Sequence, residues 1–182
     1  MFELLRADML SAFRRTDELT YLIVAAVAMG LIGSLAGAFA VYLVALAESQ
    51  LAAYIFILRD WDRGLLEGLV YYVGHMGVYI SRLVLTALFS AMASALAAVL
   101  VSPSYVLLAV LAAILTSSSS ALAAMLTAYG GLSAPAGAAM SAVLSLPPLL
   151  HMAETGAGAP AAYVICFVVA IGLLASEMLD RP

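Results

Sequence analysis

The chain contains neither lysine nor asparagine, and only seven basic and eleven acidic residues occur among its 182. A water-soluble domain needs far more polar surface than this. Hydrophobic residues instead make up 66% of the sequence. Without lysine there is no Gly-x-x-x-x-Gly-Lys-Ser/Thr phosphate-binding loop, so we expect the chain to hydrolyse no ATP by itself. Its net charge of −4 and scattered arginines predict no nucleic-acid surface.

Cysteine is scarce as well, because Cys166 stands alone and can form no disulfide within the chain. It lies in an apolar run, which favours a small buried hydrophobic side chain. The apolar runs hold no cluster with metal-ligand spacing, no paired carboxylates and no Ser/His pair with a third member. We therefore predict no metal site and no enzyme activity.

Apolar runs of about 18 or more residues, the length needed to cross a bilayer as a helix, recur from Tyr21 to Met178. They are dominated by Ala and Leu and lack the alternation of a membrane β-barrel. The sequence therefore predicts an all-α, polytopic helical membrane protein with one domain, residues 1–182. Six transmembrane helices are predicted, at residues 20–36, 39–58, 78–101, 104–128, 134–152 and 159–178.

Residues 20–58 could form two short spans with a turn near Gly33, Ser34 and Gly37, or one span and a stub, which would give five spans in total. Positively charged residues near short loops stay in the cytoplasm. Only the six-span arrangement with a cytoplasmic start places all seven arginines there. We therefore expect a protein of the cell membrane with both termini cytoplasmic.

Residues 2–15 predict an amphipathic helix on the membrane surface, because Phe2, Leu5, Met9 and Phe13 recur at helical spacing. The longest polar interruption, around residues 59–69, lies between the second and third predicted spans. As an amphipathic helix, it could dock into a partner's groove or rest at the membrane interface with Trp61 as an anchor.

This layout resembles the permease subunits of type-2 ABC exporters, and especially the haem exporter protein B (CcmB-like) family of cytochrome c biogenesis. In that family a surface helix and a hairpin precede a cytoplasmic segment of the form acid-x-x-x-Gly-x-Leu-Glu-x-Leu, which residues 60–69 match. The resemblance implies that residues 60–76 form the coupling segment that docks on an ATPase. The implied docking residues are Asp60, Trp61, Asp62, Arg63, Gly64, Glu67 and Gly68.

The resemblance also implies the partners: a separate cytoplasmic P-loop ATPase that supplies the energy of ATP, and a second permease copy or a related membrane subunit. Haem becomes the expected cargo, while the chain itself is expected to hold no cofactor. His151 and His75 are the residues that could ligate a haem iron, although each is also compatible with an ordinary surface histidine. Pro147 and Pro148 should break or kink the fifth span.

Glu48 falls midway along the second predicted span, where an isolated charge costs about 2.5–3.5 kcal/mol. It could be a proton or cation site, or a carboxyl hydrogen-bonded to Gln50 or to the hydroxyls of Thr116–Ser120. Among those hydroxyls, Ser117 and Ser118 could contact neighbouring helices or a substrate. Two other functions therefore stay open: a secondary transporter that uses Glu48, and a membrane assembly subunit that transports nothing.

Overall fold

The computed structural model describes residues 2–155 and 160–179, and every regular element within these ranges is helical. In chain order these are α1 (Phe2–Arg14), α2 (Thr16–Ala36), α3 (Ala38–Ala53), the π-helix η1 (Tyr54–Leu58), α4 (Arg59–Asp62), α5 (Leu65–Val101), the 3-10 helix η2 (Pro103–Tyr105), α6 (Val106–Gly130), α7 (Ala134–Thr155) and α8 (Pro160–Leu179). The prediction of an all-α chain is confirmed for this part. Residue 159, the predicted start of the last span, and Arg181 lie outside the described residues.

Helices long and apolar enough to cross a membrane make up most of the described chain. Five such stretches are present there: Thr16–Leu35, Phe39–Asp62, Leu65–Val101, Pro103–Gly130 and Ala134–Glu154. A shorter apolar helix covers Tyr163–Leu179. An apolar helix satisfies its backbone hydrogen bonds internally, which is the condition for residing in lipid. The chain is therefore a membrane-embedded helical protein, as its composition predicts.

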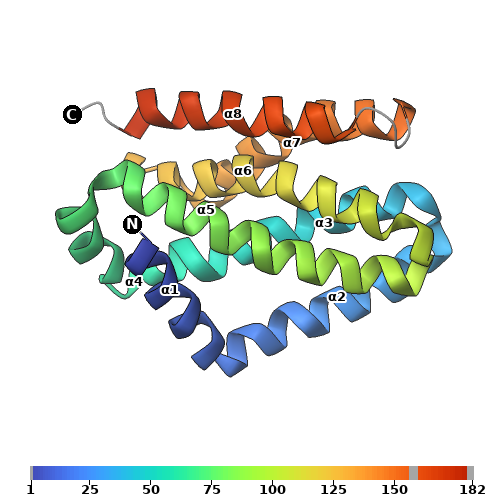
Figure 1. Cartoon of the computed structure of the whole chain (residues 1–182), viewed down its shortest axis with the longest axis horizontal. Coiled ribbons are helices and arrows are strands. Elements are labelled where there is room, and N and C mark those ends of the chain that lie inside the picture. The colour runs from blue at the N-terminus through green and yellow to red at the C-terminus, as the bar shows by residue number, and fades with distance from the viewer. Residues whose placement is uncertain (1, 156–159, 180–182) are drawn as a thin grey trace.

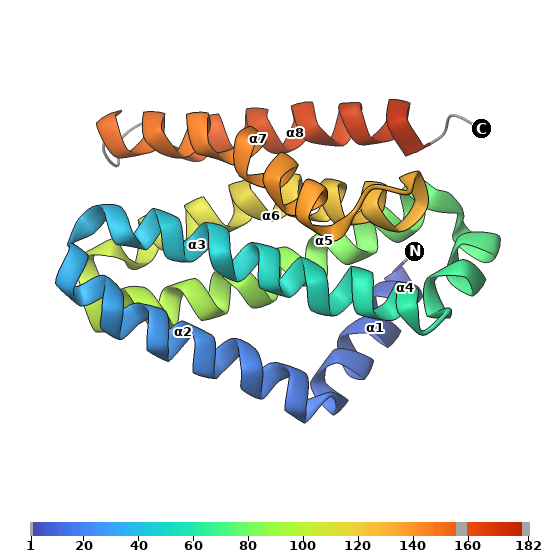
Figure 2. The same cartoon turned by 180° about the vertical axis from the view of Figure 1, so that it is seen from behind.

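Helix α6 lies at the centre of the bundle, with α3, α5, α7 and α8 packed around it (Figures 1 and 2). All of its residues from Leu115 to Leu126 are buried. Small side chains such as Ala112, Ala113 and Ala121 allow the surrounding helices to approach closely, which matters where lipid provides no hydrophobic driving force. The hydroxyl-rich part of the sequence consequently lies in the interior of the protein.

The hairpin predicted within residues 20–58 is present, and a single residue makes its turn. Gly37 adopts φ 77° between the end of α2 and the start of α3. Its N–H donates to the carbonyl oxygen of Gly33 at 3.1 Å and so closes the last turn of α2. A residue with a Cβ would be strained in this left-handed conformation. This stretch therefore contains two helices that meet at Gly37, in agreement with the predicted turn.

Pro147 and Pro148, predicted to break or kink the fifth span, do not end it, because both lie inside the continuous helix α7. A proline costs its helix one backbone donor, and neighbouring helices in a membrane can compensate for that loss. Figure 2 shows α7 changing direction along its length. The prolines therefore bend this helix without ending it.

The helix ends fall into two groups at opposite ends of the bundle. In both views α1, α4 and the last turns of α8 lie at one end, together with the connection from α6 to α7. The α2–α3 turn and the α5–α6 connection lie at the other end. The described chain therefore begins and finishes at the same end.

Candidate functional site

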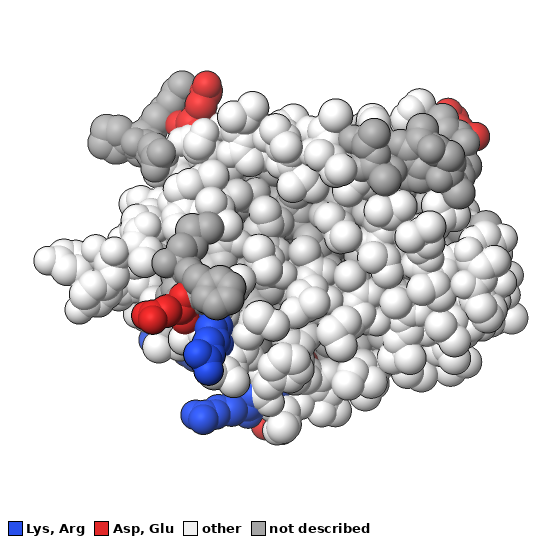
Figure 3. Space-filling view, in the orientation of Figure 1, with Lys and Arg blue, Asp and Glu red and all other residues white. Residues whose placement is uncertain are grey.

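The segment between α3 and the long part of α5 projects from the bundle. α4 ends at Asp62, Gly64 turns the chain with φ 70°, and Gly74 interrupts α5 with φ 73° and ψ 165°. The piece of α5 before Gly74 therefore runs in its own direction and forms the protrusion at the left edge of Figures 1 and 3. Tyr71 and Tyr72 on it are 86% and 82% exposed.

Most of the predicted docking residues lie on the outside of this segment. Asp62, Arg63, Gly64, Glu67 and Gly68 are exposed, and Trp61 is half-buried.

Asp60 is the exception, because its side chain is completely buried. Arg15 donates two hydrogen bonds to this carboxylate, from Nη1 to Oδ1 at 2.6 Å and from Nη2 to Oδ2 at 3.3 Å. Arg82 Nη1 lies 3.3 Å from the second oxygen. Two positive groups thus compensate the buried carboxylate, which would otherwise be very costly. The expectation that Asp60 meets a partner is corrected: it holds the segment to the bundle.

Two further acidic residues extend this ion network. Glu18, at the start of α2, lies 3.1 Å from Arg59, 3.5 Å from Arg63 and 3.4 Å from Arg15. Asp8 of α1 contacts two adjacent residues of α5, Ser81 and Arg82. It accepts a 2.5 Å hydrogen bond from Ser81 and lies 3.6 Å from Arg82. The network therefore joins α1, α2, α4 and α5.

Arg15 remains positively charged at the centre of this network. Burial by itself lowers the pKa of Arg15, but the hydrogen bond and charge of Asp60, together with the charge of Glu18, raise the pKa overall. In the space-filling view, the visible basic atoms all lie near α1 and α4 with acidic atoms beside them, while two further acidic patches lie at the upper left and upper right and most of the remaining surface on this face is uncharged (Figure 3). This end of the bundle is thus the polar one.

An aromatic cluster of Trp61, His75 and Tyr129 attaches the segment to α6. The rings of Trp61 and Tyr129 meet edge to face, with centroids 4.5 Å apart, and the ring of His75 lies 5.0 Å from Tyr129. Such pairs stabilise a contact beyond the area they bury. The segment is therefore fixed to the end of α6 as well as to α1 and α2.

The hydroxyls of Thr116–Ser120 connect α6 to three neighbouring helices. Ser117 bonds Ser90 of α5 at 2.7 Å. Ser120 bonds Ser141 of α7 at 2.8 Å and lies 3.4 Å from Ser49 of α3. Ser118 instead donates to its own helix, at the carbonyl oxygen of Leu115. The interhelical interpretation of this hydroxyl cluster is thus supported by geometry for Ser117 and Ser120.

Replacing Ser117 by Ala should lower the free energy of unfolding by about 0.6 kcal/mol, the average for hydrogen bonds between membrane helices. The hydroxyl of Ser90 would lose its partner on α6. Unfolding in mixed detergent micelles, followed by circular dichroism, measures the change. Ser34→Ala is the matched control, because Ser34 is exposed and bonds only its own helix, at Leu31. Equal effects of the two variants would contradict the interhelical role.

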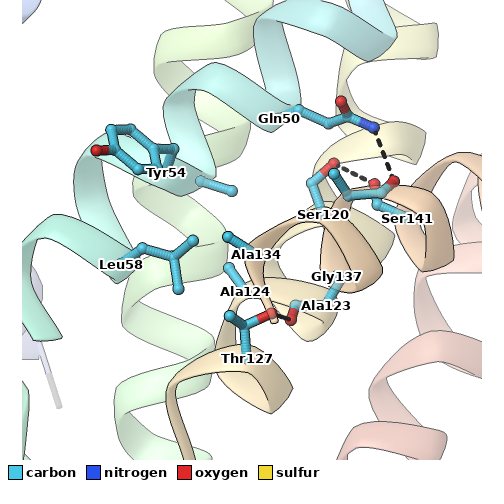
Figure 4. Close-up of a pocket in the computed structure, with 12 residues that line it drawn as sticks. Gln50, Tyr54, Leu58, Ser120, Ala123, Ala124, Thr127, Ala134, Gly137 and Ser141 are labelled. Carbon is cyan, nitrogen blue, oxygen red and sulfur yellow. Dashed lines mark hydrogen bonds between the residues drawn. The ribbon is translucent and has the colours of Figure 1, made fainter. Parts of the chain in front are cut away.

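A small cavity opens between α3, η1, α6 and α7 (Figure 4). Its volume is about 110 Å³. Gln50 reaches across it and donates to the carbonyl oxygen of Ala138 at 3.3 Å, and Tyr54 and Leu58 line it from the π-helix. π-helical turns occur frequently at functional sites. The cavity is large enough for water or a small polar group, with amide and hydroxyl groups in its wall.

Glu48 does not make the hydrogen bonds that the sequence suggested. Its side chain is completely buried, and neither carboxyl oxygen has a hydrogen-bond partner among the described residues. Gln50 faces the cavity on another side of α3, because residues two positions apart point in different directions on a helix. The expected pairing with Gln50 or with the α6 hydroxyls is therefore wrong.

The two histidines lie at opposite ends of the bundle. His75 is near the beginning of α5, and His151 is exposed near the far end of α7, with its ring 5.2 Å from Tyr163. Within the part of the chain that the structure describes, His, Cys, Asp and Glu form no group of three or more that could hold a metal ion. A single haem iron could not take both histidines as ligands.

The ion network is the feature that sequence inspection missed. Asp60 is 45 residues from Arg15, and Asp8 is 73 residues from Ser81. The single available signal was the concentration of charge at these positions in a nearly uncharged chain.

Comparison of the chain with protein-family models, with curated proteins and with solved structures gives no match.

Proposed function

We propose that this chain is the membrane permease subunit of an ABC-type exporter, moved by a separate cytoplasmic ATPase. The observation that carries the proposal is the projecting segment Arg59–Val73, which combines an exposed outer face with a buried ionic attachment to the bundle. A coupling element needs both properties. The outer face must contact the ATPase, and the attachment must transmit the movement of the ATPase to the membrane helices.

The attachment reaches the helices that would have to move. Asp60 joins the segment to the α1–α2 junction through Arg15, and to the membrane-embedded part of α5 through Arg82. A displacement of the segment would therefore act on the first and third predicted spans together. Gly74 changes the direction of the backbone between the exposed piece and the rest of α5, so the exposed piece projects from the bundle.

The proposal includes six spans, with α8 as the sixth, and a cytoplasmic location for the end that carries the arginines. The supporting observation is that α1, α4 and the end of α8 lie at the same end of the bundle. Positive residues are retained on the cytoplasmic side, and six of the seven arginines lie in the described part of this end. Haem remains the cargo implied by the resemblance alone.

The test is purification of the chain from its native membranes in a mild detergent, with identification of stoichiometric companions by mass spectrometry. A P-loop ATPase should co-purify with the parent chain. Its recovery should fall at least about tenfold, equivalent to about 1.4 kcal/mol, when Tyr71 and Tyr72 are both replaced by Ala.

Tyr21→Ala is the matched control, since Tyr21 is 65% exposed but belongs to α2 and not to the segment. It should retain the ATPase. Absence of any P-loop ATPase from the parent preparation, or full retention by the double variant, would refute the proposal. In the first case an assembly subunit or a secondary transporter would be the better description, and in the second the ATPase would dock elsewhere than on the segment.

A further inference from the structure

Buried oxygen atoms without hydrogen-bond partners are concentrated on α3 and α5. Besides the two carboxyl oxygens of Glu48, the hydroxyls of Thr86 and Ser94 have no partner among the described residues. All three side chains are at most 1% exposed. An unsatisfied buried polar group is costly, and a charged one costs far more. Their common occurrence on two packed helices therefore requires an explanation.

Helical register places Glu48 against this part of α5. Glu48 shares a face of α3 with Val44, one turn away, and Val44 lines a small void together with Ser94. Thr86 and Ser94 are each one turn from Ser90 and so share its face of α5. Ser90 itself bonds Ser117 of α6.

The contacts between α3 and α6 fix the level of Glu48 in the bundle. Thr116 donates to the carbonyl oxygen of Ala45 at 3.2 Å, and Ser49 lies 3.4 Å from the hydroxyl of Ser120. Glu48 therefore lies at the height of the α6 hydroxyls and of Ser90, where α3, α5 and α6 meet. It is deep within the bundle.

No positive charge compensates Glu48 at this depth. The described elements packed against α3 contribute no ionisable side chain along residues 22–36 of α2, 106–128 of α6 or 134–150 of α7. On α5 the nearest are Tyr79, whose hydroxyl donates to the carbonyl oxygen of Ser118, and Arg82, which is engaged by Asp8 and Asp60. Further from Glu48 on α5, His75 directly follows Gly74, and Glu67, Tyr71 and Tyr72 precede it. The other ionisable side chains of α3 and η1 are Tyr42 and Tyr54.

We propose that Glu48, with Thr86 of α5 close to its level in the bundle, forms an intramembrane proton-binding site. A proton removes the uncompensated charge and gives the carboxyl a donor, for which a neighbouring hydroxyl is the acceptor. When the proton leaves, the hydroxyl of Thr86 is the donor available to the carboxylate, after a rotation of the side chains, since the two groups make no hydrogen bond in the structure. Binding and release thus exchange one set of hydrogen bonds for another between α3 and α5. This inference does not depend on docking of an ATPase.

The test uses the full chain in lipid vesicles and records the infrared C=O band of protonated carboxyl groups from about pH 5 to about pH 9. The parent chain should show a band that weakens as the pH rises, and Glu48→Gln should remove it. Glu154→Gln, which alters an exposed carboxyl, should leave it unchanged. Thr86→Val removes a donor to the carboxylate, so the midpoint of the titration should move upward, by about one pH unit.

Three results would overturn the proposal. The first is a band that persists in Glu48→Gln, which would assign it to another carboxyl. The second is a Glu48 band that does not change over the whole range, which would make the proton permanent. The third is a carboxylate at every pH. If Glu48→Gln fails to fold, the titration of Thr86→Val still decides, because an unchanged midpoint excludes the hydroxyl from the site.

Discussion

Replacing Asp60 by Asn should lower the free energy of unfolding by about 3–5 kcal/mol, the usual cost of removing one partner from a buried ion pair. Asn keeps the shape of the side chain and loses its charge. Arg15 and Arg82 would then face each other's charge without the carboxylate between them. Arg82 is 3% exposed, and its Nε already has no hydrogen-bond partner among the described residues. Unfolding in mixed micelles, monitored by circular dichroism, measures the loss.

Asp62→Asn provides the control, since Asp62 lies two residues away on the same short helix and is exposed. Exposed ion pairs contribute about 0–1 kcal/mol, so this variant should unfold close to the parent. If both variants unfold alike, the network around Asp60 does not stabilise the fold. The attachment of the projecting segment would then need another explanation.

Replacing Gly30 by Ala should cost about 1–3 kcal/mol of stability through overpacking. A Cβ at Gly30 would lie 3.0 Å from both the Cα and the carbonyl oxygen of Ala97. These are backbone atoms of α5 and cannot rotate away, so α2 and α5 would have to separate. The same unfolding measurement detects the loss.

Gly172→Ala on α8 is the matched substitution, because a Cβ there meets nothing within 4 Å. In an open helical position alanine is favoured over glycine by up to about 1 kcal/mol. The two variants should therefore change stability in opposite directions. A Gly30→Ala protein as stable as its parent would show that the contact between α2 and α5 can relax.

The sequence predicted the features that depend on local pattern. The length of the apolar runs predicted the membrane helices, and the spacing of Phe2, Leu5, Met9 and Phe13 predicted α1. The glycines near residue 37 predicted the hairpin turn. The polar interruption around residue 60 likewise gave the projecting segment. Each of these signals is contained within a few helical turns of the chain.

What could not be predicted depends on packing between distant parts of the chain. Nothing in the pattern around Asp60 distinguishes it from Asp62, yet the first is buried against two arginines and the second is exposed. Similarly, Glu48 and Gln50 are neighbours in sequence but face different helices. Which side of a helix meets which neighbour is decided by the whole bundle, and so is the partner of each buried charge.

The turn at Gly37 also bears on how the protein is made. A single glycine connects α2 to α3, so no polar loop separates the two helices as they leave the ribosome. The backbone groups at the turn are partly satisfied by the bond from Gly37 to Gly33 and by another from Ala40 to Gly37. The pair can therefore partition into the bilayer as one preassembled hairpin, with a hydrophobic tip leading. Biosynthesis would need no translocation of a hydrophilic connection at this point, and a glycosylation or protease site inserted after Gly37 would test the route taken.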